Sequence, residues 1–133
     1  MNGTISAAGR DVVPSYGVAG LDPSGTAGVV MSDAFLGCLA LTAEYSSSSL
    51  PLPGTYLAVG IPTFDEGVAD ENFVYFAVAP EKGTDFGGGG SNAGTVEVLD
   101  GGDTVVTIRV EYDDTLSDGN YIVSGDFTVS RCP

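Results

Sequence analysis

The chain contains neither histidine nor tryptophan among its 133 residues. Without histidine it cannot form a Ser-His-Asp or Cys-His nucleophile system, or a histidine-based zinc or iron site. Without tryptophan it lacks the largest aromatic surface for stacking on a sugar ring. We therefore expect a protein that is not an enzyme, with a weak acid/base hydrolase, built on two converging carboxylates, as the enzymatic alternative.

Basic residues are scarce. Four lysines and arginines stand against eighteen acidic residues, and the net charge is -14. Such a surface repels nucleic acid and anionic lipid, so we expect no nucleic-acid partner. No apolar run approaches the roughly eighteen residues of a membrane-spanning helix. The acidity fits solubility outside a cell, with cation binding as the alternative.

Cysteine is also rare, with Cys38 and Cys132 as the only two. Two cysteines are too few for a thiolate metal site, and these two are not spaced as a Cys-x-x-Cys redox motif. A disulfide between them is the natural interpretation, and two buried free thiols are the alternative. The bridge would close a loop of over ninety residues. It would stabilise the fold by about 2–4 kcal/mol.

Glycine is abundant, and the last forty residues alternate in hydrophobicity. Three segments rich in β-branched and aromatic residues, Thr95–Asp100, Thr104–Tyr112 and Tyr121–Arg131, predict an antiparallel meander. In the middle segment Val106, Ile108 and Val110 alternate with polar residues, so one face is apolar. Alternation also turns Cys132 away from Phe127 and Val129, unless a bulge or a strand end near Arg131 intervenes.

Five further strands are expected along the rest of the chain, at Thr4–Ala8, Asp11–Val18, Thr26–Met31, Tyr56–Ile61 and Phe73–Ala79. Ser32 and Asp33 can cap a short helix that carries Cys38, although a strand fits the same stretch. Pro62–Asn72 and Pro80–Asn92 are predicted loops. The fold class is therefore mainly β: a single domain, residues 1–133, with an antiparallel β-sandwich or partly closed β-barrel of seven to eight strands and one short helix.

One loop gathers oxygen ligands. Asp113, Asp114 and Asp118 lie between two predicted strands, together with an amide and hydroxyl groups. Calcium takes such hard oxygen ligands, and this makes the three aspartates a candidate metal site, although the loop fails the EF-hand pattern. A plain hairpin loop is the alternative. No cofactor other than calcium is expected.

Several short motifs follow one another along the chain: Gly3-Thr4-Ile5, the segment Ala27–Asp33 leading to Cys38, Pro53-Gly54-Thr55-Tyr56, Gly94-Thr95-Val96-Glu97-Val98, and the closing Gly125–Cys132. In this order they resemble uncharacterised exported proteins and putative lipoproteins of myxobacteria and their relatives. The resemblance implies a location in the bacterial envelope, the periplasm or outside the cell, and a bridge between Cys38 and Cys132. It implies no known activity.

The expected function is that of an exported structural or ligand-binding module with an unknown protein or glycan as ligand. A calcium-dependent adhesion or carbohydrate-binding module is one alternative. A subunit of an extracellular assembly, pairing through an exposed strand of the amino-terminal hairpin, is another. The sequence leaves open whether the protein is a monomer or self-assembles. Tyr16, Tyr45 and Phe86, near loops, are the aromatic candidates for a binding surface.

Overall fold

The computed structural model describes most of the chain. The described residues are 3–7, 10–21, 25–33, 37–38, 54–79, 85–88, 94–114 and 121–132. They contain eleven β-strands: β1 Thr4–Ala7, β2 Arg10–Val12, β3 Tyr16–Leu21, β4 Ala27–Ser32, β5 Gly54–Ile61, β6 Gly67–Val68, β7 Phe73–Ala79, β8 Asp85–Gly88, β9 Gly94–Gly101, β10 Val105–Asp114 and β11 Tyr121–Arg131.

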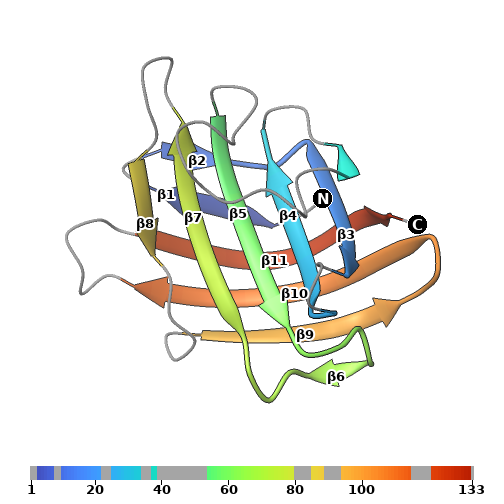
Figure 1. Cartoon of the computed structure of the whole chain (residues 1–133). Coiled ribbons are helices and arrows are strands. Elements are labelled where there is room, and N and C mark those ends of the chain that lie inside the picture. Colours follow the sequence, from blue (N-terminus) through green and yellow to red (C-terminus); the bar gives the residue numbers. More distant parts are fainter. Residues whose placement is uncertain are drawn as a thin grey trace.

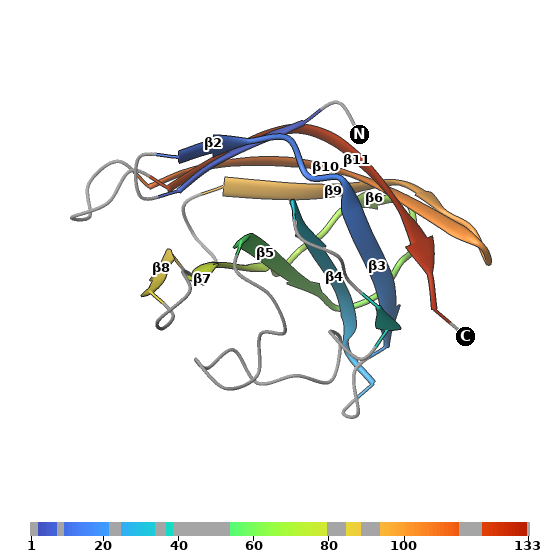
Figure 2. The ribbon, with the colours of Figure 1, turned by 90° about the horizontal axis from the view of Figure 1, so that it is seen from above.

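The strands form one sheet in the order β6-β9-β10-β11-β3-β4-β5-β7-β8, with β1 beside β11 and β2 beside β1. The sheet curls, so that β3, β4, β5, β7 and β8 lie across the layer of β9, β10 and β11 (Figures 1 and 2). We call the layer of β1, β2, β6, β9, β10 and β11 the back layer. All neighbouring strands are antiparallel except β11 and β3, which pair in parallel through Ser130 with Val18 and Arg131 with Ala19.

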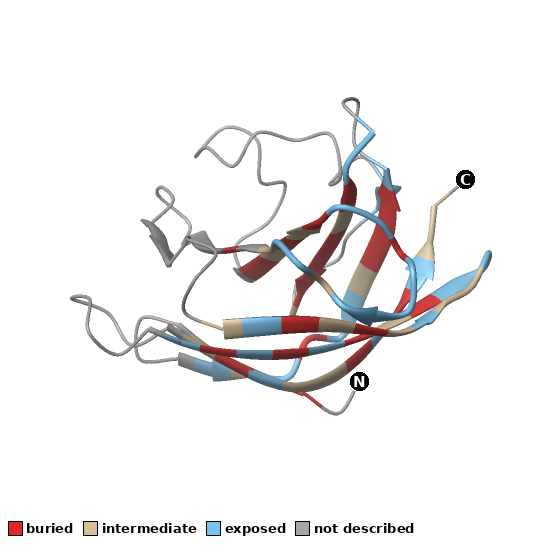
Figure 3. Cartoon of the chain, turned by 90° about the horizontal axis from the view of Figure 1, so that it is seen from below, coloured by how far each residue is buried: buried red, intermediate tan, exposed pale blue. Residues whose placement is uncertain are grey.

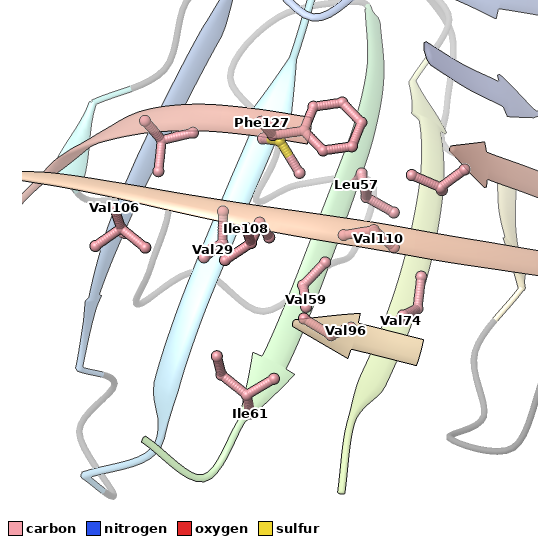
Figure 4. Close-up of a cluster of buried hydrophobic side chains, with 14 of the residues drawn as sticks. Val29, Leu57, Val59, Ile61, Val74, Val96, Val106, Ile108, Val110 and Phe127 are labelled. Carbon is pink, nitrogen blue, oxygen red and sulfur yellow. The ribbon is translucent and has the colours of Figure 1, made fainter. Parts of the chain in front are cut away.

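The core fills the space between the two layers. Buried and exposed residues alternate along the strands of the back layer (Figure 3), as expected for a sheet with one solvated face. Ile108, Val110 and Phe127 point from the back layer toward Val29 and Leu57 of the other layer (Figure 4). Phe127 and Leu57 have no exposed surface. The alternation in the last forty residues therefore correctly identified the inner face.

The predicted fold class is confirmed: the described chain is mainly β and forms a sandwich that is partly closed, like a half-barrel. The meander β9-β10-β11 and the amino-terminal hairpin β1-β2 are present. The number of strands was predicted too low by three: β6 lies in the predicted loop Pro62–Asn72, β8 lies in the predicted loop Pro80–Asn92, and one predicted strand is divided in two. β6 and β8 contain glycine and lack the alternation that the prediction relied on.

Two boundaries differ from the prediction. The expected strand Asp11–Val18 is divided into β2 and β3 at the buried Pro14, because proline has no N–H group to donate to a ladder. Ser32 is the last residue of β4 and is fully buried. The described residues contain no α-helix, and most of the predicted helix, residues 34–36 and 39–43, lies outside them.

Candidate functional site

A set of polar side chains lines the outer face of the back layer, on the side away from the core. We call this set the polar outer face; its members are exposed or half-buried, and they are Glu97, Thr107, Arg109, Glu111, Ser124, Asp126 and Thr128. They alternate with core residues such as Ile108 and Val110, because successive residues of a strand face opposite sides of the sheet. The face is thus positioned by the same pattern that builds the core.

The register of β10 against β11 brings six of these side chains together in directly opposite pairs. The two hydroxyl oxygens of Thr107 and Thr128 are 3.0 Å apart. The Arg109 Nε donates to Asp126 Oδ1 at 2.8 Å, and its Nη2 to Oδ2 at 3.3 Å. The Ser124 hydroxyl donates to Glu111 Oε2 at 2.8 Å. Three neighbouring cross-strand pairs therefore hold one another in fixed positions on an open surface.

Arginine 109 is the cationic centre of this face. Its hydrogen bond to Asp126 and the charge of that carboxylate raise the pKa of Arg109, and the charges of Glu97 and Glu111 add to the effect. The same hydrogen bond lowers the pKa of Asp126 below the ordinary value of 3.8, although desolvation opposes the shift. Asp126 is therefore an ionised hydrogen-bond acceptor at neutral pH, the opposite of a carboxyl group prepared to act as a general acid.

This pair predicts a small pH dependence of stability. The folded-state pKa of Asp126 is lowered, so its ionised form stabilises the fold above the unfolded-state pKa, and the contribution is lost as the pH falls through the folded-state pKa. We expect Asp126→Asn to be slightly less stable than the wild type at pH 7. The difference should shrink as the pH falls below about 4. Urea unfolding at pH 7, 5 and 3 measures it, and a difference that is equally large at pH 3 would contradict this role.

The disulfide joins Cys38 to Cys132, as predicted, with a Cα–Cα distance of 5.9 Å. Cys38 is exposed and Cys132 is half-buried, and neither belongs to the core cluster. β11 ends at Arg131, directly before the cysteine. Since Phe127 and Val129 face the core, the alternation that turns Cys132 outward is consistent with a bridge at the surface.

Arg131 closes one end of the sandwich. Its Nη1 donates to the carbonyl oxygen of Gly102 at 3.0 Å and approaches that of Gly101 at 3.5 Å. Its guanidinium carbon lies 4.9 Å from the centre of the Phe64 ring, which is 8% exposed. One side chain thus connects the end of β11 to the β9–β10 turn and to the segment before β6.

We expect Arg131→Met to lower the free energy of unfolding by about 1–2 kcal/mol, because the charged hydrogen bond and the cation–π contact are lost together. Arg131→Lys should recover only part of this, since lysine lacks the planar group. Arg109→Met is the matched control: it removes an equally long cation from an exposed pair, and its effect should be smaller. Chemical denaturation of the three variants tests this, and equal losses for Arg131→Met and Arg109→Met would contradict it.

The predicted calcium ligands lie at the far end of the same hairpin. Asp113 is exposed and pairs with Ile122, and Asp114 pairs with Tyr121. Asp118 lies outside the described residues. Among the residues that the structure does describe, no three His, Cys, Asp or Glu side chains gather closely enough to hold a metal ion. The calcium site therefore stays a prediction.

The outer edge of β9 is covered along most of its length. Gly67 and Val68 of β6 pair with Val98 and Glu97. The amide of Ala69 donates to the carbonyl oxygen of Val96 at 2.9 Å. Asn72 Nδ2 approaches the carbonyl oxygen of Gly94 at 3.4 Å. A covered edge resists pairing with other chains, and the exposed carboxylates of this segment add charge there.

The amino-terminal hairpin has a different kind of edge. β2 pairs with β1 and with no other strand of the described sheet, and it is only three residues long. Of the aromatic candidates, Tyr16 is 42% exposed at the start of β3. Phe86 lies on β8, opposite Ala77, and Tyr45 lies outside the described residues. The structure therefore does not bring the three aromatic candidates into one described surface.

Comparison with protein-family models, with curated proteins and with solved structures finds no match to this chain. No helix in the described ranges is long and apolar enough to cross a membrane.

Two interactions in the structure were not predicted from the sequence. The Arg131–Phe64 contact joins positions far apart in the chain, and no local pattern relates them. The Arg109–Asp126 pair depends on the register of a hairpin whose loop contains several turn-forming residues, so the sequence does not fix which residues face each other. A useful signal was present: Arg109 is the only basic residue of its strand and falls on the polar side of the alternation.

Proposed function

We propose that this protein is a non-enzymatic, exported β module of the bacterial envelope or exterior, which acts as a structural or ligand-binding domain. The observation that carries the proposal is the Cys38–Cys132 disulfide, because such bridges persist in oxidising compartments and are rare in the cytosol. The resemblance to exported proteins of myxobacteria supports the same location. The absence of histidine supports a role without Ser-His-Asp or Cys-His nucleophilic catalysis.

The polar outer face is the proposed contact surface. Its side chains are held by their cross-strand partners, so a ligand that binds them orders few additional groups. Hydroxyl and carboxylate groups on an open sheet suit a polar ligand such as a glycan or a hydrophilic protein surface. The side chains belong to three adjacent strands, and the face is therefore as rigid as the sheet itself.

A glycan array probed with labelled protein tests this surface. Thr107→Val/Glu111→Gln removes a hydroxyl and a charge from the face while keeping residues that suit a strand. Asp65→Asn/Glu66→Gln is the matched control, because both acids are exposed on the segment before β6. We expect binding by the wild type and the control, and loss of binding in the face variant. Equal binding by all three proteins would contradict the assignment of the face.

The calcium and assembly alternatives predict a different result in solution. Light scattering on the untagged protein, once with EDTA and once with calcium, gives its mass in both states. A monomer in both conditions favours a stand-alone binding or spacer domain. A larger mass with calcium would favour a calcium-dependent adhesion or assembly role involving Asp113, Asp114 and Asp118, and isothermal titration without calcium heat would exclude that role.

A further inference from the structure

The two sides of β11 are paired very unequally. On one side, every residue from Tyr121 to Ser130 pairs with β10. On the other side, the amino-terminal part pairs with β1, and only Ser130 and Arg131 pair with β3. We call this short parallel pairing the β3–β11 seam. It is the junction at which the sheet passes from the back layer to the other layer (Figure 2).

The disulfide lies at the end of this seam. The amide of Cys132 donates to the carbonyl oxygen of Ala19 at 2.7 Å, and so continues the pairing by one hydrogen bond. Cys38 follows β4, the strand that pairs with β3 along its whole length. The bridge therefore ties the end of β11 covalently to the β3–β4 side of the molecule, at a place where few backbone pairs do so.

The neighbouring contacts do not replace this tie. The amide of Arg131 donates to the carbonyl oxygen of Thr104 at 2.9 Å, and its side chain reaches Gly102 and Phe64. Thr104 and Gly102 lie between β9 and β10, and Phe64 lies before β6, so all three are next to strands of the back layer. None of them belongs to β3 or β4. If the bridge is opened, the end of β11 keeps its pairing with β10 and loses its covalent link to Cys38, on the β3–β4 side of the molecule.

We propose that the Cys38–Cys132 bridge is a redox-controlled latch on the β3–β11 seam. A dithiol reductant opens it. One thiolate attacks the sulfur of Cys38, the more exposed residue of the pair, and Cys132 leaves as a thiolate that takes a proton from water. The second thiol then resolves the mixed disulfide, so that two electrons pass, Cys38 becomes a free thiol and the dithiol becomes a disulfide. The seam then opens locally while the core between the layers stays packed. This inference goes beyond the proposed function and does not depend on it.

Hydrogen exchange at two adjacent amides tests the latch. The amide at position 132 points to β3, and the amide of Arg131 points to the β10 side. In the oxidised protein, we expect both to be protected. After reduction with dithiothreitol, protection at position 132 should fall at least tenfold relative to that of Arg131, because only the seam opens. Cys38→Ser/Cys132→Ser should behave in the same way without reductant, since the serine at position 132 keeps its backbone amide.

A disulfide that only restricts the unfolded chain would give a different pattern of amide protection, because it changes the free energy of global unfolding and does not affect local opening of the seam. Protection at positions 131 and 132 would then change together, and this result would overturn the latch. The amide of Val59 reports whether the core stays folded, because Val59 is buried in β5 between β4 and β7. Loss of protection at Val59 to the level of an unfolded chain would also overturn it.

Discussion

Removal of the Cys38–Cys132 bridge should lower the free energy of unfolding by about 2–4 kcal/mol. The bridge spans 94 residues of sequence, so the unfolded chain gains much freedom when it is cut. For a chain of this length, such a loss corresponds to a fall in melting temperature of roughly 10 °C. Calorimetry or chemical denaturation of the oxidised protein and of Cys38→Ser/Cys132→Ser measures the difference.

Thiol blocking provides the control for this experiment. The reduced and alkylated wild type should melt close to the double serine variant, because both lack the bridge and neither can re-form it. An unchanged melting temperature, together with two titratable thiols in the untreated protein, would show that the bridge contributes nothing to the fold.

Truncation of Phe127 should have an effect of similar size. Phe127 is fully buried in the core cluster that also contains Leu57, and it pairs with Ile108 of β10 (Figure 4). Phe127→Ala removes the aromatic ring and leaves a cavity, and we expect a loss of about 3–5 kcal/mol in the free energy of unfolding. Urea denaturation measures it. Tyr16→Ala is the control, because Tyr16 is an aromatic residue that is 42% exposed, and it should lose clearly less.

The packing around Phe127 can also be tested at Gly3, which lies against the Phe127 ring. A Cβ atom at position 3 would overlap the ring of Phe127, and the amide of Gly3 donates to the carbonyl oxygen of Asp126 at 3.0 Å. Gly3→Ala should therefore destabilise the wild type by about 1–3 kcal/mol through overpacking. In a Phe127→Leu background, the same change should cost less, because leucine occupies less of the space. A double-mutant cycle measures this coupling, and purely additive effects would contradict the close packing.

The predictable parts of the fold are strands in which hydrophobic residues repeat along the segment and face the core. β10 shows this most clearly: Val106, Ile108 and Val110 alternate with polar residues, and all three are fully buried. β7 was predicted with its exact bounds, Phe73–Ala79, from a run of β-branched and aromatic residues. In both cases the sequence repeats the same signal over several residues, so a single ambiguous position matters little.

The rest depends on contacts that no short segment encodes. β6 exists because β9 offers an open edge, and its two residues, Gly67 and Val68, carry no strand pattern of their own. The parallel seam between β11 and β3 pairs the last strand with the third, and no local sequence pattern specifies the order of strands in the sheet. The same holds for the candidate site. The polar residues of the outer face can be identified in the sequence, but which of them face each other depends on the register of β10 against β11.

The bridge and the polar outer face lie on different parts of the same strand. Cys132 directly follows β11, while Ser124, Asp126 and Thr128 occupy its middle. The proposed contact surface therefore belongs to the strand that the disulfide holds at its end. β10 supports this face along its whole length, so we expect the face to keep its geometry when the seam opens.

The proposed export requires that the Cys38–Cys132 bridge is formed when the native protein is in an oxidising compartment. The most direct test is the intact mass of the protein, recovered from such a compartment, after alkylation in denaturant without reductant. We expect an unmodified chain, because both sulfur atoms are in the bridge, and two alkyl groups per chain after prior reduction. Two alkyl groups without reduction would mean that Cys38 and Cys132 are free thiols, and this would contradict both the proposed latch and the proposed export.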